Sequence, residues 1–222
     1  MPPLRRRNLG SARMSKKLIG RKRPNIWESA DLRQEQHDAK RRLILKQAAV
    51  LFADRGFHET TIDQIAEALQ VSKPTIYYYI DSKEDLLYEV AHTALADLKA
   101  ALSRDQDEQL SAIDRLARFF TMYGRLILSE FGVCLALVSD RSLNPQSRRR
   151  LRSLKKQFEV EVQKILDEGR ADGTIRVDDP KMFTVAIFGA FNWAPQWFSN
   201  TGPSTPDEIT AAIFAVFRKA MR

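Results

Sequence analysis

The sequence has little cysteine and no long apolar run, which excludes several large protein classes. One cysteine, Cys134, occurs among the 222 residues, so no disulfide can form within the chain, and this fits a reducing cytoplasm. The richest apolar stretch, residues 182–198, is interrupted by Asn192, Pro195 and Gln196. It falls short of the roughly 18 apolar residues that a membrane-spanning helix needs. We therefore expect a cytoplasmic protein that has no membrane partner.

Signatures of catalysis and of metal binding are also missing. The three histidines, His37, His58 and His92, are scattered and lack the spacing of metal ligands. The sequence contains no Gly-x-Ser-x-Gly elbow, no phosphate-binding glycine loop and no paired cysteines. It thus predicts a protein that is not an enzyme and has neither a metal site nor a cofactor.

The positive charge of the chain is concentrated at its N-terminus. Residues 1–34 contain ten Lys and Arg against two acids, Glu28 and Asp31, so the whole formal charge of +8 lies there, and the remainder is balanced at 26 bases and 26 acids. A basic arm beside a neutral body suits a polyanion such as DNA, although a solvated tail that binds nothing specific is the alternative. Its Gly, Pro, Ser and basic content predicts disorder. Translation from Met14 would remove four of the arginines.

Beyond the arm, apolar residues recur at helical spacing. Ile44, Ala48, Leu51 and Phe52 form one stripe, which Gly56 can close, and similar stripes follow at residues 86–102, 113–127, 151–165 and 209–220. No alternating run is long enough for a strand, so we predict an all-α protein. Residues 182–198 are apolar nearly all round and need cover on more than one side, from a second subunit or a ligand. Pro195 should kink or end that helix.

Residues 60–88 contain two short helices joined by a turn. Thr61 and Gln64 have the spacing of a capping box, which predicts a helix start, and Ser72 can cap a second helix with Pro74 in its first turn. The residues predicted to face inward are Ile62, Ile65, Ala66, Leu69, Ile76 and Ile80. Three consecutive tyrosines, residues 77–79, cannot all point inward from one helix. The pattern is therefore typical of a helix-turn-helix, whose second helix fits the major groove of DNA.

Residues 40–88 resemble the DNA-binding domain of TetR-family repressors. The matching segments are Ala48-Ala49-x-Leu51-Phe52, Arg55-Gly56-Phe57, Thr60-Thr61, Ile65-Ala66, Val71-Ser72, Thr75-Ile76-Tyr77 and Ser82-Lys83-Glu84-x-Leu86-Leu87. The resemblance implies nine or ten helices, a homodimer, a palindromic operator in double-stranded DNA and a ligand-responsive C-terminal domain. One departure is Gln70, where the family usually has glycine at a turn that often needs positive φ.

The expected DNA contacts combine this resemblance with the polar tips of the second helix. They are Thr61, Lys73, Thr75, Tyr77, Tyr78, Tyr79 and Lys83, with Thr61 and Lys83 mostly at phosphates. The predicted organisation is a basic arm at 1–34, a three-helix helix-turn-helix domain at 35–85, and an effector-binding and dimerisation domain at 86–222. We expect the dimer to form on residues 181–198 and 207–220, whose second helix bears the apolar stripe Ile209, Ile213, Val216 and Phe217.

The C-terminal half gives a less specific picture. Residues 169–176 resemble the loop that precedes the dimer-forming helices in many TetR-family members. Residues 189–202 resemble the corresponding segment of a branch of the family that regulates fatty-acid, steroid or aromatic catabolism. Several members of that branch respond to acyl-CoA thioesters. The expected effector pocket consists of Tyr123, Phe131, Phe188 and Trp193 around an acyl chain and Arg148, Arg149 and Arg152 near its phosphates. A different hydrophobic ligand, core aromatics and a solvated basic helix face are the alternatives.

Two classes of function fit a helical chain of this kind. The first is a TetR-type regulator, a repressor released from its operator by a small hydrophobic effector. The second is a helical adaptor that binds other proteins and lacks sequence-specific DNA binding. Salt-sensitive and sequence-selective binding to DNA separates the two classes, because only the first neutralises phosphates and reads bases.

Overall fold

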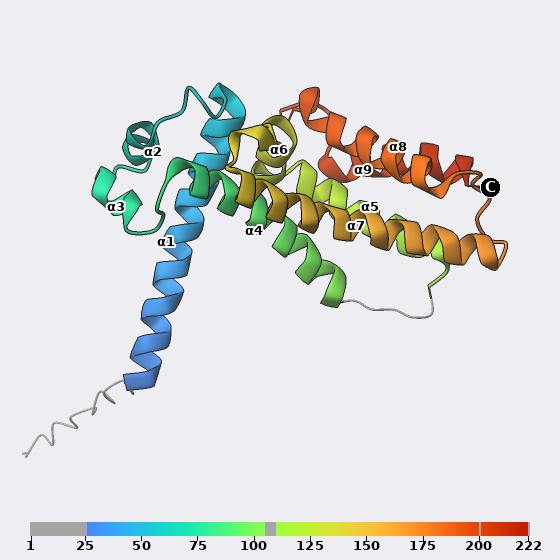
Figure 1. Cartoon of the computed structure of the whole chain (residues 1–222), viewed down its shortest axis with the longest axis horizontal. Helices are drawn as coiled ribbons and strands as arrows, with labels where there is room; N and C mark the ends of the chain where they lie inside the picture. The colour runs from blue at the N-terminus through green and yellow to red at the C-terminus, as the bar shows by residue number, and fades with distance from the viewer. Residues whose placement is uncertain (1–25, 105–109, 200, 222) are drawn as a thin grey trace, which may run out of the picture. The chain divides into compact units, whose positions relative to one another are not determined.

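The computed structural model describes residues 26–104, 110–199 and 201–221 (Figure 1). Over these residues the regular structure is helical and no strand forms, which confirms the all-α prediction. The helices are α1 (Ile26–Arg55), α2 (Ile62–Ala68), α3 (Lys73–Tyr77), α4 (Lys83–Arg104), α5 (Ala112–Ile127), α6 (Glu130–Leu137), α7 (Pro145–Ala171), α8 (Pro180–Trp193) and α9 (Pro206–Ala220). Within the same ranges no single helix is long and apolar enough to cross a membrane. Helices α5 and α6 together have the required length and apolar composition, but the chain bends by 86° between them.

The chain divides into two compact units between Asp38 and Ala39, within α1. The described part of the first unit is the beginning of this helix, where the Gln34 side chain donates to Asp38 Oδ1 one turn later (3.0 Å). The predicted basic arm lies outside the described residues as far as residue 25. Residues 26–34, which we expected to be disordered, are helical instead. A formed helix extends by one hydrogen bond per residue, so polar residues can join it without an apolar stripe of their own.

Polar capping residues fix where most helices of the second unit begin. Each of these side chains accepts a hydrogen bond from a backbone N–H in the first turn: Ser111, Ser129, Asn144, Asp179 and Thr205. Proline occupies the first turn of α7, α8 and α9, where no intrahelical partner for its missing N–H is needed. At the other end of α1, Gly56 has φ 85°, which confirms that glycine ends this helix.

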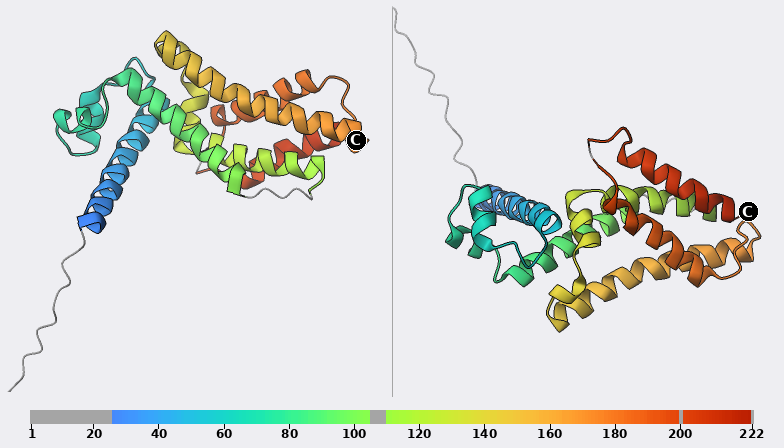
Figure 2. Two further views of the ribbon diagram at one scale, coloured as in Figure 1. Left: turned by 60° about the horizontal axis from the view of Figure 1, so that its bottom comes forward. Right: turned by 90° about the horizontal axis from the view of Figure 1, so that it is seen from above.

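Helix α5 is central to the second unit, because it packs against α4, α6, α7, α8 and α9 (Figure 2). Its buried face contains three neighbouring aromatic residues, Phe119, Phe120 and Tyr123. The Phe120 ring centroid lies 5.0 Å from that of Phe191 on α8 and 6.2 Å from that of Phe214 on α9. Such stacked rings add to the stabilisation that burial of their area gives. The aromatic cluster therefore joins the two C-terminal helices to the core.

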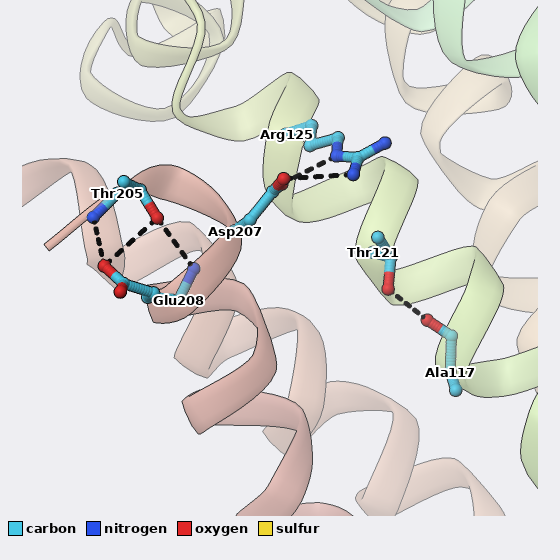
Figure 3. Close-up of polar contacts among 6 residues, drawn as sticks. All are labelled: Ala117, Thr121, Arg125, Thr205, Asp207 and Glu208. Carbon is cyan, nitrogen blue, oxygen red and sulfur yellow. Dashed lines mark hydrogen bonds and ion pairs between the residues drawn. The ribbon is translucent and has the colours of Figure 1, made fainter.

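Helices α5 and α9 pack against each other, and Figure 3 shows the polar contact between Arg125 and Asp207 that joins them. A Cβ added at Gly124 would lie 2.2 Å from Thr210 Oγ1, so only glycine fits there without a shift. One residue further along α5, the Arg125 guanidinium binds the Asp207 carboxylate through two hydrogen bonds of 2.7 and 3.0 Å. Thr205 begins α9 with a capping box. The seam thus combines a steric contact with a bidentate ion pair at its exposed edge.

Helix α8 is apolar on two opposite faces. Its inner face contains the buried residues Thr184, Ile187 and Phe191, and its outer face contains the exposed residues Met182, Val185 and Trp193. The helix ends at Trp193, two residues before Pro195, which confirms the predicted effect of the proline. An exposed apolar face along a whole helix needs cover from outside the protomer.

Candidate nucleic-acid interface and ligand cavity

Helices α2 and α3 are the two short helices predicted within residues 61–80. Thr61 Oγ1 accepts from the backbone N–H of Gln64 (3.2 Å) and Gln64 Oε1 accepts from that of Thr61 (2.9 Å), so the capping box is confirmed. Ser72 caps α3, with Pro74 in the first turn. The buried side chains of the pair are Ile62, Ile65, Ala66, Ile76 and Ile80. Local capping and a small apolar face therefore fix the helix-turn-helix.

The turn between α2 and α3 places Gln70 at φ 55°. This is the left-handed region, in which a residue with a Cβ is strained by on the order of 1 kcal/mol. The Gln70 side chain is exposed, so no buried contact offsets the strain. The turn keeps the backbone geometry in which the family usually has glycine, and the chain tolerates the strain.

We expect Gln70→Gly to raise the free energy of unfolding by about 0.5 kcal/mol. The substitution removes the strain, and the greater flexibility that glycine gives the unfolded chain offsets part of the gain. Glu67→Gly, an exposed site within α2, is the control and should lower the free energy of unfolding by about 1 kcal/mol. Urea denaturation measures both. Equal destabilisation by the two substitutions would show that the turn holds no strain at Gln70.

The outward face of α3 is polar and aromatic. Lys73, Thr75, Tyr77 and Tyr78 are exposed, whereas Tyr79 is half-buried against the core. The Thr75 hydroxyl lies 2.8 Å from the Ser72 hydroxyl. Hydroxyls both donate and accept hydrogen bonds, and an ammonium donates three, so these groups can bind phosphate oxygens and base edges. Thr61, at the exposed start of α2, offers its hydroxyl close to the N-terminus of that helix, where phosphates bind favourably.

An ion pair links the two helices of the motif. Lys73 Nζ lies 2.8 Å from Asp63 Oδ2, and this hydrogen bond and the charge of Asp63 raise the pKa of Lys73. The pair is exposed, so it contributes little to stability in water. It keeps the ammonium fully protonated at the first turn of α3.

Lys83, at the start of α4, is held by the chain itself. Its Nζ donates to three backbone carbonyls, those of Phe57 (2.8 Å), His58 (3.3 Å) and Thr60 (2.8 Å), and lies 4.4 Å from the centroid of the Phe57 ring. An ammonium has three N–H donors, so all of them are used here. A phosphate contact by Lys83 would have to replace one of these bonds. The geometry instead joins α4 to the loop between α1 and α2.

A cavity of about 180 Å³ lies between α4, α5, α6, α7 and α8. It is lined by Leu95, Tyr123, Leu135, Ala136, Lys155, Phe158, Glu159, Phe188 and Asn192. Six of these nine residues are aromatic or aliphatic, and polar groups of Lys155, Glu159 and Asn192 contribute the rest of the lining. This composition is typical of sites for small molecules.

The polar groups of the cavity differ in how they are paired. The Tyr123 hydroxyl donates to Asn192 Oδ1 (2.5 Å), and burial raises the pKa of Tyr123, so the phenol stays neutral. Glu159 accepts a hydrogen bond from Lys156 (2.9 Å), on the exposed side of α7. Removal from water lowers the pKa of Lys155. Among the described residues, those of the cavity included, no group of three or more His, Cys, Asp or Glu is placed to hold a metal ion.

The cavity brings together two of the four aromatic residues expected there. Tyr123 and Phe188 line it, but Phe131 and Trp193 do not. Phe131 is buried beneath the guanidinium of Arg42, 5.5 Å from its ring centroid. Trp193 is 64% exposed on the outer face of α8. Adjacent helical residues point about 100° apart, so Asn192 occupies the position that we expected for Trp193.

The three arginines expected near the effector phosphates do not line the cavity. Arg148 donates to the backbone carbonyls of Leu143 (2.9 Å) and Arg141 (3.2 Å), and Arg152 binds the carboxylate of Asp140 (2.7 Å). Arg149 is exposed near the start of α7. Two of the three guanidinium groups are therefore engaged within the chain.

The pocket expected from the sequence did not include three polar residues that line the cavity, Lys155, Glu159 and Asn192. For Lys155 there was a usable pattern: it lies four residues after Leu151 and three before Phe158, on the apolar stripe of α7. Asn192 interrupts the apolar segment of α8, and this interruption is the signal that could have pointed to it. Nothing in the pattern distinguishes Glu159 from the other acids of α7.

Helix α4 connects the cavity with the helix-turn-helix. It begins at Lys83, beside the loop that precedes α2, and its Leu95 lines the cavity. Near its start, Glu89 binds Arg41 of α1 (2.9 Å), and the Tyr88 ring lies 5.6 Å from the Arg150 guanidinium of α7. A displacement of α4 at the cavity would therefore also move its contacts with α1 and with the loop that precedes α2.

Known family models match most of the chain. The model described as "Bacterial regulatory proteins, tetR family" matches residues 44–90, and the model described as "Tetracyclin repressor-like, C-terminal domain" matches residues 109–221. The chain belongs to the TetR family. It is a TetR-type transcriptional regulator, in which the helix-turn-helix lies in the N-terminal domain and the cavity in the C-terminal domain.

Similar proteins extend over both domains of this TetR-family chain. The "HTH-type transcriptional repressor KstR2" of Mycolicibacterium smegmatis is 24% identical over 191 residues, which cover 82% of this chain and 90% of the relative. The "Fatty acid metabolism regulator protein" of Bacillus subtilis is 24% identical over 151 residues, 67% of this chain and 78% of the relative. The structure of AibR in complex with isovaleryl coenzyme A and operator DNA has a TM-score of 0.70 at 25% identity and covers 79% of this chain and 96% of AibR.

Proposed function

We propose that this TetR-family protein is a repressor that binds a palindromic operator as a homodimer and is released by a coenzyme A thioester. The observation that carries the proposal is the exposed face of α3, with Lys73, Thr75 and Tyr77. Support for the effector class comes from relatives named for fatty acid metabolism and from AibR in complex with isovaleryl coenzyme A and operator DNA.

In this proposal α3 lies in the major groove, which is about 12 Å wide and admits one helix. Tyr77 and Tyr78 reach base edges or thymine methyl groups, and Lys73 and Thr75 bind at the groove margin. Thr61 binds a phosphate at the start of α2. Two residues expected to contact DNA take a supporting role: Tyr79 packs beneath α3, and Lys83 holds the loop before α2.

The proposed arm contact rests on the charge of residues 1–34. Because Asp63 balances Lys73 and the chain beyond residue 34 is neutral overall, the arm supplies the excess positive charge. Its lysines and arginines bind phosphates and add to the salt dependence of binding. Phosphate contacts have no direct sequence information, so the arm raises affinity without changing base preference.

The dimer surface that we propose is the apolar face that α8 and α9 leave exposed, and we call it the outer face. Its residues are Met182, Val185, Gly189, Trp193, Ala212 and Val216. The α9 stripe expected from the sequence divides between two surfaces: Ile209, Ile213 and Phe217 are half-buried within the protomer, whereas Val216 is exposed. A two-fold axis through this face places the two α3 helices roughly 34–36 Å apart, or a multiple of that, to meet successive major grooves.

Release requires a ligand that favours a conformation in which the α3 helices no longer match the operator. The cavity wall at Leu95 belongs to α4, so a ligand that displaces α4 also moves Lys83 and the motif that it holds. The ligand shifts this equilibrium only by its differential affinity for the two conformations. Arg149, exposed near the start of α7, is the proposed partner of the coenzyme phosphates, together with Arg148 and Arg152 if they exchange their present acceptors.

Selection of genomic DNA fragments on the purified protein tests this function. The retained fragments should share a palindrome, and binding should weaken steeply between about 50 and 200 mM salt. Acyl-CoA added to that complex at about 100 μM, equivalent to roughly −5.5 kcal/mol, should release the labelled fragment, as measured by anisotropy. Retention of all fragments alike would contradict repression, and failure of every thioester to release DNA would contradict the effector class alone.

A further inference from the structure

One charged group of the cavity, the Lys155 ammonium, has no direct hydrogen-bond acceptor among the described residues. Lys155 lines the cavity and makes no hydrogen bond or ion pair with another described residue. The nearby carboxylates are occupied by other cations: Asp140 binds Arg152 (2.7 Å), and Glu159 binds Lys156 (2.9 Å). Asp140 therefore stabilises the charge of Lys155 only at longer range, and the Lys155 ammonium has no direct acceptor at this wall among the described residues. An ammonium donates hydrogen bonds and accepts none, so its missing partner is an acceptor, strongest if anionic.

The rest of the wall limits the size of what the cavity holds. Its volume is about 180 Å³, and its apolar part is formed by Leu95, Leu135, Phe158 and Phe188. An apolar cavity of roughly 150 Å³ holds one benzene molecule. A branched chain or a single ring of on the order of six carbon atoms therefore fits, whereas a long saturated chain or a fused ring system exceeds the space.

The Tyr123 hydroxyl, another polar group of the cavity, already donates its proton within the chain. Tyr123 donates to Asn192, so the hydroxyl proton is not available to a ligand unless that bond breaks. Lys155 also borders a second, narrow space beneath α4, which contains Asp140 and Cys134 but only about 10 Å³ of room. The ligand group next to Lys155 is thus a small acceptor attached to a compact apolar body.

We propose that the cavity selects a compact acyl group, branched aliphatic or aryl, whose carboxyl oxygen accepts a hydrogen bond from Lys155. The inference rests on the proposed effector site and narrows its ligand. Two sources supply the same chemistry, a free carboxylate or the carbonyl of its coenzyme A thioester. The ammonium has one role in both cases, which is to donate a hydrogen bond to the acyl oxygen.

Calorimetry with the full chain tests the inference in two steps. In the first step, isovaleryl-CoA, benzoyl-CoA, palmitoyl-CoA, isovalerate, benzoate and free coenzyme A are titrated into the wild-type protein. We expect a compact thioester or acid to bind with a Kd about tenfold or more below that of palmitoyl-CoA. This step needs no variant, so a folding defect cannot obscure it.

In the second step, Lys155→Met should raise the Kd of the compact ligands about tenfold or more, because a buried acyl oxygen loses its donor. Lys164→Met is the matched control, since Lys164 lies on the same helix, is exposed and does not line the cavity. The control should leave each Kd within about twofold. Circular dichroism of both variants checks that α7 and its neighbours remain folded.

The outcomes separate this inference from the proposed function. Tight binding of palmitoyl-CoA, or unchanged Kd values in Lys155→Met, overturns the inference, while release of operator by a thioester still supports the coenzyme A proposal. Lys155-dependent binding of a free acid without binding of any thioester supports the inference and overturns the coenzyme A proposal. Absence of binding by all six compounds overturns both.

Discussion

The Val185→Glu variant is expected to be monomeric and to bind operator about 100-fold or more weakly than the wild type. Val185 is 58% exposed on the outer face of α8, and in the proposed dimer it lies between two copies of that face. A two-fold axis would place two new carboxylates in an apolar interface, where unpaired charges are destabilising by several kcal/mol. Separated half-sites also lose the high effective concentration that joins them.

The matched control for this variant is Val160→Glu. Val160 is 52% exposed on α7, close to the exposure of Val185, but it does not belong to the outer face. It should remain dimeric and bind operator with wild-type affinity. Sedimentation at micromolar concentration measures assembly, and anisotropy measures operator binding. A dimeric Val185→Glu protein would contradict the assignment of the interface, and loss of assembly in both variants would point to a general effect of charge.

The Gly124→Ala variant is expected to lower the free energy of unfolding by about 2–3 kcal/mol. A Cβ at residue 124 would lie 2.2 Å from Thr210 Oγ1 and 2.9 Å from Thr210 Cβ, so rotation of the threonine cannot remove the clash. Helices α5 and α9 must therefore separate, and overpacking of this kind typically destabilises a protein by about 1–3 kcal/mol. The shift also loosens the aromatic contacts between α5 and α9.

A double-mutant cycle tests the assigned cause. Gly124→Ala with Thr210→Ala removes the two outer atoms of the clash and should recover part, but not all, of the lost stability, because Thr210 Cβ stays in place. Thr210→Val alone should be neutral or stabilising, since Thr210 Oγ1 is buried with no hydrogen-bond partner among the described residues. Additive effects in the cycle would show that the clash lies elsewhere.

Local physical rules made the helix-turn-helix predictable from the sequence. The capping side chains of Thr61 and Ser72 act within three residues of themselves, and Ile76 and Ile80 are one turn apart. The positive φ at Gln70 was expected from the resemblance to the TetR family, which usually has glycine at this turn. Such features need no knowledge of distant contacts, which is why the helix boundaries and the buried face agree with the structure.

The cavity and the seam between α5 and α9 depend on contacts that no local pattern determines. Tyr123 and Asn192 lie 69 positions apart, and their hydrogen bond depends on how α5 and α8 cross. The rotation of α8 about its axis decides that Asn192 faces the cavity and that its neighbour Trp193 faces outward. The sequence pattern does not determine this rotation. Helix α6 escaped prediction as well, because its apolar residues surround it and show little helical periodicity.

The central claim, that the outward face of α3 binds DNA, is tested most directly by a matched pair of lysine variants. Lys73 and Lys164 are both exposed and both face a carboxylate, at 2.8 Å for Asp63 and 3.9 Å for Glu168. Each change to alanine removes the same charge from the same protein. Operator affinity is measured by anisotropy over a range of salt concentrations for the wild type, Lys73→Ala and Lys164→Ala.

The account predicts that Lys73→Ala lowers operator affinity about tenfold or more and reduces the salt slope by about 2 per dimer, one phosphate contact for each subunit. Lys164→Ala should match the wild type in both respects. Tyr77→Ala, measured alongside, should lower affinity with little change in the salt slope, because its contact is uncharged. Wild-type affinity and slope in Lys73→Ala together with wild-type affinity in Tyr77→Ala would contradict the claim that α3 is the DNA-reading helix.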